Sequence, residues 1–499
     1  MKNIRKYLIP WMVMSIMACV DDKGNYDYVS ITEVLPFEMV VEQAGKPVGD
    51  EIDYRIGTLL DLSLQLEGEV DTMDYSFVWF AVRQGIGGAT RDTLSTTSKV
   101  QVSLDYDPGN YQLYVEAHKK HTEVYKSVTF PMSVTTIMSK GWYLLKDKGG
   151  KCDFDFITAE GEVLSDVIAG TGAEPLNGAA RSVAYMPSRY TYTYTDESGK
   201  EISEANKRAL FVLSEKEMRI LNADNNGAFH VQGDCFYEPL QEYDFGCIKF
   251  CGNAVYLTNA GYSHSLTTSS PNVGRLGWAK DPTAGYRIYP EILVGNYSSL
   301  YWDINTSTFL QLGTYDVVYS KFPEQATGKE PSVSPTNMGK ELVRLLPRKD
   351  CETTATAMAL LKDETGAYFL AEISIAFTGA YPFTSYKELP ADLYFPRADV
   401  MAAHREAAAV YFAKGNEVWK YIHADEVPER EVTTGISFPG EEISYIQQME
   451  DFLLIVTYKE EKWKMYRFQL IGDTSDVQTE PMEEPYEGNG YVRKVFFRS

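Results

Sequence analysis

Short runs in which apolar and polar residues alternate recur along the whole chain. In the run YSFVWF, which begins at Tyr75, the side chains of Tyr75, Phe77 and Trp79 point to one side of an extended backbone and the residues between them point to the other. A period of two is the pattern of a half-buried β-strand. Comparable runs predict six strands in the first part of the chain, at residues 31–41, 53–67, 75–83, 99–105, 111–117 and 125–134.

These first strands have the features of a two-sheet domain. Trp79 lies in the middle of its run, and the turn Asp107-Pro108-Gly109-Asn110 leads into a return strand that begins at Tyr111. A central Trp strand and a Gly-x-Tyr return strand are what an immunoglobulin-like β-sandwich uses to fill its interior. We therefore predict a β-sandwich over residues 26–136. Its aspartates lack the spacing of an EF-hand calcium loop.

Residues 137–499 repeat a looser unit, in which an apolar strand, a polar turn and an aromatic-rich strand follow one another. The units at Val410–Tyr421 and Leu454–Tyr466 are the most alike. One apolar marker per unit can be placed every 43 to 60 residues, at Phe211, Tyr256, Phe309, Phe369, Phe412 and Ile455. A period of about 50 residues in an all-β chain is typical of four-stranded propeller blades.

The length of this second segment predicts about seven blades, with six or eight as alternatives. We also expect Val492–Phe497 (VRKVFF) to pair near Gly141–Leu145 (GWYLL), because this pairing would close the ring and cover a sheet edge. The predicted fold is therefore all-β, with a sandwich followed by a β-propeller.

Composition narrows the classes of partner. The formal net charge is −23, and a surface this acidic repels phosphate backbones, which argues against a nucleic-acid partner. The chain holds 35 Tyr against 23 Phe and 7 Trp. Tyr is common at half-exposed strand positions and on surfaces that bind sugars or peptides. For any single Tyr the structural role is the more frequent one.

The cysteines indicate neither a disulfide framework nor a metal site. Apart from Cys19, discussed below, they are odd in number and irregularly spaced: Cys152, Cys235, Cys247, Cys251 and Cys351. A disulfide framework is therefore not expected. Cys247 and Cys251 lie in FGCIKFCGNAVYL, a predicted core strand and turn, where small buried thiols fit better than zinc ligands. No metal and no cofactor is predicted.

Catalytic motifs do not stand out. The sequence has no Gly-x-Ser-x-Gly elbow, no His-Glu-x-x-His helix and no phosphate loop. A pair of carboxylates that cleaves glycosidic bonds stays possible, because 70 acidic residues offer many pairs. We expect a binding protein, and a propeller-type polysaccharide hydrolase or lyase is the alternative.

Two segments are candidates for ligand binding. Tyr190, Tyr192 and Tyr194 alternate with Thr along one strand, which would place three rings on one face of a hairpin that projects from the ring. The alternative is that this row packs on a neighbouring blade. The second segment is the long polar loop 259–278, which contains Tyr262 and a solvated His264 and ends at Trp278. Long propeller loops often carry recognition.

The N-terminus has the order of an export signal. Three basic residues, Lys2, Arg5 and Lys6, precede the apolar run Tyr7–Ala18. Twelve residues are too few to span a bilayer, which needs about 20, but they suit a signal-peptide core. Residues 1–18 are therefore predicted to be removed. Ile16-Met17-Ala18-Cys19 resembles a bacterial lipobox, which implies that Cys19 is acylated. An ordinary signal peptide with an incidental cysteine is the alternative.

The residues that follow Cys19 carry a family resemblance. Asp21 and Asp22 resemble the surface-export signal of Bacteroidetes lipoproteins. The run DDKGNYDY, from Asp21 to Tyr28, resembles the opening of Bacteroidetes lipoproteins with a PKD-like domain. Residues 19–25 would then be a lipidated tether and residues 26–136 a PKD-like spacer.

The resemblance implies an outer-membrane protein that faces the cell exterior and is held by its lipid alone. It further implies a non-catalytic accessory of a SusC/SusD-type importer that binds a glycan or peptide ligand, the transporter, or both. A structural scaffold without a ligand is a further alternative.

Overall fold

The protein is described by a computed structural model, in which the chain divides into two compact units, Met1–Thr135 and Thr136–Ser499. This division lies one residue from the expected boundary. The predicted signal peptide, Cys19, Asp21 and Asp22 lie outside the described residues. No helix in the described part of the chain is long and apolar enough to cross a membrane. The described residues are 34–68, 70–84, 91–267, 274–324, 332–376, 383–423, 429–472 and 474–498.

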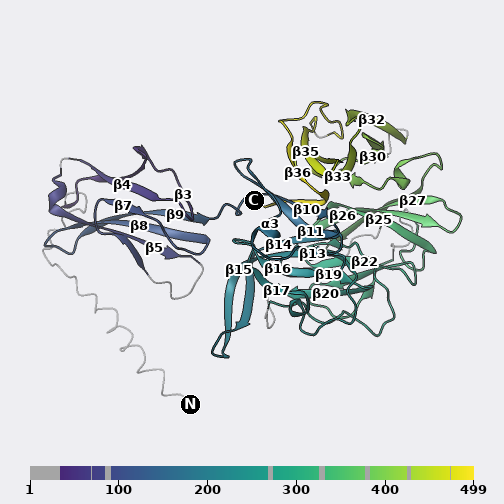
Figure 1. Ribbon diagram of the computed structural model, residues 1–499, viewed down its shortest axis with the longest axis horizontal. Helices are drawn as coiled ribbons and strands as arrows, with labels where there is room; N and C mark the ends of the chain where they lie inside the picture. Colours follow the sequence, from purple (N-terminus) through teal and green to yellow (C-terminus); the bar gives the residue numbers. More distant parts are fainter. Residues whose placement is uncertain are drawn as a thin grey trace, which may run out of the picture. The chain divides into compact units, whose positions relative to one another are not determined.

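The first unit is a sandwich of two sheets, as predicted (Figure 1). The strand orders are β2-β1-β4-β7 and β3-β9-β8-β5-β6, and β3 runs parallel to β9. A single turn of 3-10 helix, η1 (Thr72–Asp74), precedes β5. The strands are β1 (Glu38–Gln43), β2 (Lys46–Pro47), β3 (Ile52–Arg55), β4 (Leu60–Glu67), β5 (Tyr75–Arg83), β6 (Asp92–Ser95), β7 (Lys99–Val102), β8 (Gly109–Lys119) and β9 (Tyr125–Thr135).

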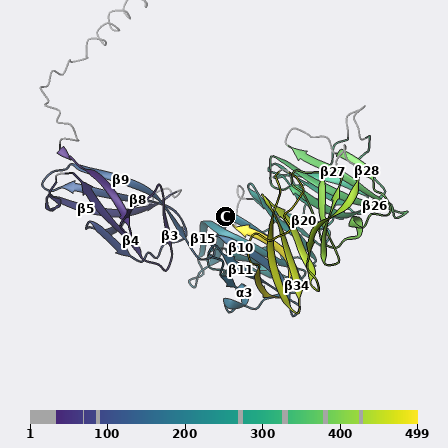
Figure 2. The same ribbon diagram turned by 90° about the horizontal axis from the view of Figure 1, so that it is seen from above.

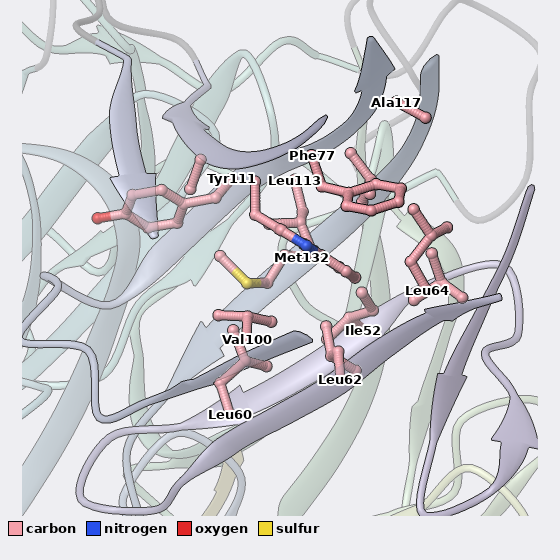
Figure 3. Packing of buried hydrophobic residues seen from close by; sticks show 14 of the residues in the cluster. Ile52, Leu60, Leu62, Leu64, Phe77, Val100, Tyr111, Leu113, Ala117 and Met132 are labelled. Atoms are coloured by element: carbon pink, nitrogen blue, oxygen red, sulfur yellow. The ribbon is translucent and has the colours of Figure 1, made fainter. Parts of the chain in front are cut away.

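The core of this unit lies between the two sheets. Figure 3 shows Leu62 and Val100 of one sheet facing Leu113 of the other. Trp79 is fully buried, and its Nε1 donates a hydrogen bond to the Thr97 carbonyl at 2.8 Å. The alternation predicted for β5 is therefore confirmed.

One predicted strand of the sandwich is wrong. Residues 53–67 form not one strand but two, β3 and β4, which belong to different sheets. The chain turns between them at Gly57, whose φ is +88°. A glycine adopts this left-handed conformation readily, and the crossover carries the chain from one sheet to the other.

The second unit contains seven sheets in its described residues (Figure 1, Figure 2). This number confirms the predicted propeller of about seven blades. The first three sheets, called blades 1 to 3, include helix α3 (Val167–Gly170) and 3-10 helix η2 (Gln232–Cys235) in their connections. Their strands are β10 (Gly141–Lys148), β11 (Lys151–Thr158), β12 (Val163–Leu164), β13 (Leu176–Asn177) and β37 (Tyr491–Arg498) in blade 1, β14 (Ala180–Thr195), β15 (Glu201–Ser214), β16 (Met218–Asn222) and β17 (Ala228–Val231) in blade 2, and β18 (Phe245–Cys251), β19 (Ala254–Asn259) and β20 (Tyr262–Thr267) in blade 3.

Blades 4 to 7 each have four antiparallel strands. The 3-10 helix η3 (Phe395–Arg397) precedes blade 6. The strands are β21 (Leu293–Val294), β22 (Ser298–Asp303), β23 (Thr308–Gly313) and β24 (Ser320–Lys321) in blade 4, β25 (Lys340–Lys349), β26 (Thr354–Asp363), β27 (Tyr368–Ala376) and β28 (Phe383–Glu388) in blade 5, β29 (Met401–Ala403), β30 (Ala409–Lys414), β31 (Glu417–Ile422) and β32 (Arg430–Ser437) in blade 6, and β33 (Glu442–Met449), β34 (Phe452–Lys459), β35 (Lys462–Gln469) and β36 (Tyr486–Asn489) in blade 7.

Apolar side chains fill the gap between each blade and the next. One buried cluster joins blades 1 and 2, another joins blades 2 and 3, and the series continues around the unit. The last cluster packs Leu454 and Trp463 of blade 7 against Trp142 and Leu144 of blade 1. Because the series returns to its starting blade, the seven sheets form a closed ring.

The two ends of this unit meet in one sheet. The C-terminal strand β37 pairs antiparallel with β10, from Gly141 opposite Arg498 to Asp147 opposite Tyr491. The predicted ring closure is therefore confirmed. A register shift lies between Leu145 and Lys146. Because β37 pairs only with β10, it takes the innermost position of blade 1, as β14 does in blade 2.

Arg498 fixes the end of β37. It is 1 % exposed, and its guanidinium donates to the Met138 carbonyl at 2.9 Å and forms an ion pair with Asp224 at 2.9 Å. The same group also lies 4.7 Å from the centre of the Tyr185 ring. Arg498 thus links the C-terminal strand to the start of the unit and to blade 2.

Replacing Arg498 should weaken the ring far more than replacing an exposed arginine of the same strand. Arg498→Met leaves buried acceptors without a donor, and we expect the free energy of unfolding to fall by about 3 kcal/mol. Arg493→Met is the control, because the Arg493 side chain is 48 % exposed in its ion pair with Asp147, and such a pair should be worth about 1 kcal/mol or less. Chemical denaturation measures both. Equal losses for the two variants would contradict the role of Arg498.

Candidate functional site

The innermost strands of the blades surround a cavity of about 710 Å³. Its wall is built from β14, β18, β21, β25, β33 and β37, which belong to six of the seven blades. We call this cavity the central channel. Its volume lies in the range of about 300–1,000 Å³ that small-molecule sites usually have. Because the wall belongs to strands held by inter-blade packing, the channel is part of the ring itself.

Charged side chains surround one mouth of the channel. Arg181 is the second residue of β14, Arg493 is the third residue of β37, and Asp244 directly precedes β18. Corresponding strands of a propeller run in the same direction, so these residues lie at the same end. Arg181 pairs with Glu215 at 2.7 Å, and Arg493 pairs with Asp147 at 2.7 Å. We call this end the arginine mouth.

The interior of the channel contains an ammonium group and a phenol. The Nζ atom of Lys494 lies 5.8 Å from the centre of the Tyr445 ring. Tyr445 raises the pKa of the Lys494 ammonium, with smaller contributions from the Asp350 and Glu291 carboxylates. Lys494 therefore stays protonated at neutral pH. Glu291 accepts a hydrogen bond from the backbone N–H of Leu345 at 3.0 Å, which fixes a carboxylate in the same wall.

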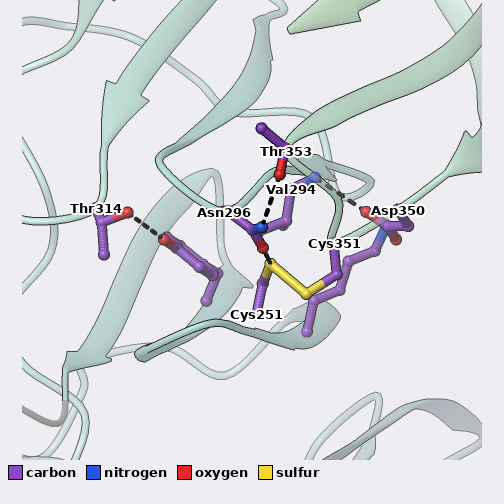
Figure 4. Close-up of a disulfide and its surroundings, with 9 residues drawn as sticks. Cys251, Val294, Asn296, Thr314, Asp350, Cys351 and Thr353 are labelled. Atoms are coloured by element: carbon purple, nitrogen blue, oxygen red, sulfur yellow. Dashed lines mark hydrogen bonds and ion pairs between the residues drawn. A yellow bond between two sulfur atoms is a disulfide. The ribbon is translucent and has the colours of Figure 1, made fainter. Parts of the chain in front are cut away.

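The other end of the channel is closed in by an ion pair and a disulfide (Figure 4). Lys249, near the end of β18, pairs with Asp350 and donates to the Ile292 carbonyl at 2.7 Å. Asp350 also accepts a hydrogen bond from the N–H of Val294 at 3.1 Å. These contacts join blades 3, 4 and 5.

The disulfide joins Cys251, the last residue of β18, to Cys351, just after β25, with a Cα–Cα distance of 5.2 Å. The expectation that Cys251 is a free thiol, and that no disulfide forms, is therefore wrong. The bridge passes over blade 4, whose innermost strand β21 has only two residues. Because the two cysteines are separated by 100 residues, their spacing does not reveal the pairing. Cys152, Cys235 and Cys247 are free.

The tyrosine row of β14 begins in the apolar cluster between blades 2 and 3, as the alternative of packing on a neighbouring blade predicted. Tyr190 is fully buried, and its hydroxyl donates to the Gly274 carbonyl at 2.8 Å. The proposal that Tyr190 contacts a ligand is therefore corrected. Tyr192 and Tyr194 lie on the long hairpin of β14 and β15, which extends beyond the blade (Figure 1). Their ring centres are 5.0 Å apart, and Tyr192 lies 4.6 Å from Phe229. These rings mostly cover one another.

The second predicted segment does present aromatic side chains to solvent. Trp278 is 67 % exposed and Tyr262 is 41 % exposed. Trp278 stacks on Tyr237 with 5.9 Å between ring centres. Val317 and Val318 are also exposed, and the backbone of Val317 is bonded to that of Asp281, three residues after Trp278. We call Tyr237, Trp278, Val317 and Val318 the aromatic surface.

His264 is not solvated, contrary to expectation. It is 3 % exposed, and its Nδ1 lies 3.0 Å from the Gly277 carbonyl. The segment 277–280 covers it, because Gly277 and Lys280 donate backbone hydrogen bonds to Ser265 and Ser263 of β20. This segment takes the place that a fourth strand has in other blades. Within the described ranges, no group of three or more His, Cys, Asp or Glu side chains could hold a metal ion.

Sequence reasoning missed the charged residues of the channel. Lys249 lies inside the apolar run FGCIKFC and Lys494 inside VRKVFF. A single lysine in the middle of a predicted apolar strand could have indicated a polar cavity, because a lysine is costly to bury in a sheet without a polar partner.

Comparison with known proteins supports the prediction that the first unit is PKD-like. Residues 19–179 match the PKD-like family, a stretch that includes the sandwich and extends into blade 1 as far as β13. The first unit is therefore a PKD-like domain. No curated protein matches the sequence.

Among the solved structures that resemble this chain, the following three are similar over most of its length. A quinoprotein alcohol dehydrogenase-like protein from Bacteroides thetaiotaomicron is 14% identical, covering 91% of this chain and 98% of that one, with a TM-score of 0.39. The extracellular domain of a one-component system from the same organism is 9% identical over 91% and 71%, with a TM-score of 0.29. Rhamnogalacturonan lyase YesW is 10% identical over 87% and 66%, with a TM-score of 0.20. Likeness at this level assigns neither an activity nor a ligand.

Thiol labelling tests the disulfide at the channel. We expect iodoacetamide to modify Cys152, Cys235 and Cys247 in the unfolded, unreduced protein, and Cys251 and Cys351 only after reduction. The double variant Cys251→Ala/Cys351→Ala should lose roughly 2–4 kcal/mol of stability, because the bridge closes a long loop. Cys247→Ala, which keeps the bridge, is the control. Labelling of Cys251 without reduction would show that the bridge is absent.

Proposed function

We propose that this protein is a lipid-anchored outer-membrane protein on the cell surface that binds a nutrient ligand as a non-catalytic accessory of a SusC/SusD-type importer. One observation carries this proposal. The match to the PKD-like family begins at Cys19, the residue at which the signal pattern of residues 1–18 ends. A family match that begins at the cysteine of a lipobox is what a lipoprotein should give.

The anchor follows from the chemistry of that cysteine. Cleavage before Cys19 would leave an N-terminal thiol for acylation, and each buried CH₂ group of an acyl chain contributes about 0.8 kcal/mol to membrane binding. Several chains together hold a protein firmly. Asp21 and Asp22, directly behind the lipid, supply the acidic signal for the outer leaflet.

The disulfide agrees with export. Disulfides form and persist in oxidising compartments and are rare in the cytosol. The bridge links Cys251 to Cys351, which lines the central channel, so a reducing compartment would loosen the site. A chain exported past the inner membrane would meet the oxidising conditions that this bridge requires.

The central channel is the ligand site that the geometry supports best. It combines an enclosed volume with converging polar groups such as Lys494, Glu291 and Arg287, which is the usual construction of a small-molecule site. Asp350 is engaged by Lys249 and by the Val294 N–H. These partners favour a binding role for this carboxylate over that of a general acid or base.

The aromatic surface is the natural contact for the transporter. Exposed Trp and Tyr side chains dominate binding energy at protein interfaces, and contiguous exposed apolar groups mark interaction sites. Trp278 and Val317 lie on outer parts of blades 3 and 4, whereas the channel is lined by the inner strands. Both contacts can therefore be made at once.

Lipidation at Cys19 is tested by metabolic labelling with an alkyne fatty acid. We expect the wild-type protein to carry the label and to fractionate with the outer membrane. Cys19→Ser should lose both properties, because it removes the thiol that would carry the acyl chains, whereas Cys247→Ser should keep both. Surface exposure is then read from protease treatment of intact cells. An unlabelled wild-type protein would refute the anchor.

The transporter contact is tested by co-purification from solubilised outer membrane. We expect Trp278→Ala to reduce the amount of co-purified SusC/SusD-type transporter about tenfold or more, because truncating an interface Trp removes a large buried contact. Tyr125→Ala removes a similarly exposed, stacked ring from the PKD-like domain and serves as the control. If no transporter accompanies the wild-type protein, the accessory role is wrong.

A further inference from the structure

A second cavity shares a lining residue with the central channel. A groove of about 630 Å³ lies between blades 4 and 5 and is lined by Tyr289, Trp302, Glu341 and Lys362. Ile304 lines both the channel and this groove, and it is 43 % exposed. The two cavities therefore lie on either side of one half-exposed side chain. A ligand that fills both must be an extended chain rather than a single small molecule.

The charges of the channel are balanced, in contrast to the whole chain. The formal net charge of the protein is −23. Among the described residues, the charged channel side chains that have no ion-pair partner within 4.0 Å are two bases, Arg287 and Lys494, and two acids, Asp244 and Glu291. The other channel bases are already paired, Arg181 with Glu215, Arg493 with Asp147 and Lys249 with Asp350.

Balanced charge selects a neutral polar ligand. Guanidinium and ammonium groups only donate hydrogen bonds, and carboxylates only accept them. A sugar hydroxyl does both, so it can pair with Lys494 and with Glu291. A polyanion would be repelled by Asp244 and Glu291, and a polycation would be repelled by Arg287 and Lys494. The groove also mixes both signs of charge, with Lys340 and Lys362 beside Glu341, Asp363 and Glu364.

Aromatic rings supply the apolar part of the site. Phe250, Tyr445 and Phe497 line the channel and are each half-buried. A half-exposed ring offers a flat apolar face, which fits the C–H face of a sugar ring. Rings beside mixed charges thus match a neutral, ring-shaped, polyhydroxylated repeat unit.

A peptide fits the junction less well. Extended peptides are usually bound along a free sheet edge or by apolar anchor pockets. On the channel side, at the end of blade 4 opposite to Ile304, the innermost strand β21 has two residues, and the segment after β25 covers its edge. Cys351 donates to the Val294 carbonyl at 2.8 Å, and Asn296 donates to the Glu352 carbonyl at 3.1 Å. This edge is therefore not available to an added strand.

We propose that one neutral oligosaccharide occupies both cavities, with one part inside the central channel and the rest in the groove between blades 4 and 5, joined past Ile304. The inference rests on the proposed ligand-binding function and adds the chemical class and the extended shape of the ligand. It requires neither the anchor nor the transporter, so it can be tested on the purified chain.

The test begins with the full-length protein in detergent on an array of neutral, uronic-acid and amino-sugar oligosaccharides, together with acidic and basic decapeptides. The tightest neutral oligosaccharide is then titrated calorimetrically at chain lengths from two to eight sugars. We expect affinity to rise with length until both cavities are filled. Lys494→Met should weaken every length roughly tenfold to a hundredfold, because it removes a charged donor inside the channel.

Lys362→Met in the groove should weaken only the longer chains, and Ile304→Arg at the junction should abolish the gain with length. Lys462→Met, which changes an exposed lysine on the outer strand β35 of blade 7, is the matched control and should change nothing. Circular dichroism checks that each variant is folded.

Each outcome decides the inference. Length-dependent binding of a neutral oligosaccharide with this pattern of variants supports it. Preference for a uronic-acid chain, an amino-sugar chain or a peptide overturns it. Binding of a neutral oligosaccharide that is unchanged in Lys494→Met and Lys362→Met also overturns it. If no saccharide or peptide binds while the transporter still co-purifies, this inference fails and the accessory role stands. If neither ligand nor transporter binds, both fail.

Discussion

The structure depends on packing between blades that is closed into a circle. Each blade buries its two faces only because it has a neighbour on both sides, and the last neighbour of blade 7 is blade 1. The pairing of β37 with β10 supplies this last contact from the two ends of one segment. Without it, the inner edge of β10 and the apolar faces of blades 1 and 7 would meet water. The channel has a fixed shape because the ring that surrounds it is closed.

Blade 4 is the weakest part of this ring, and its reinforcement forms part of the site. Its innermost strand β21 has two residues, too few to hold neighbours on its own. The disulfide from Cys251 to Cys351 and the ion pair from Lys249 to Asp350 span it from blade 3 to blade 5. Lys249, Asp350 and Cys351 also line the central channel. Stabilisation and recognition are thus combined around one short strand.

The sequence predicted the architecture well because propeller blades repeat local patterns. Blade number and ring closure follow from apolar runs such as Val492–Phe497. Marker spacing was uneven for a definite reason: Phe309 and Phe369 lie in third strands, β23 and β27, whereas Phe412 and Ile455 lie in second strands. The site was harder to predict, since it depends on contacts between distant segments. Nothing in the sequence near Cys251 indicates Cys351, and the burial of His264 depends on the segment that follows it.

Hydrogen exchange of backbone amides tests the closed ring most directly. The account predicts that amides of β10 and β37 exchange together and as slowly as those of the central strands β19 and β30, because a closed ring opens only by global unfolding. Rapid exchange in β37 while β19 and β30 stay protected would contradict the account. In that case the channel would not have the fixed wall on which ligand binding depends.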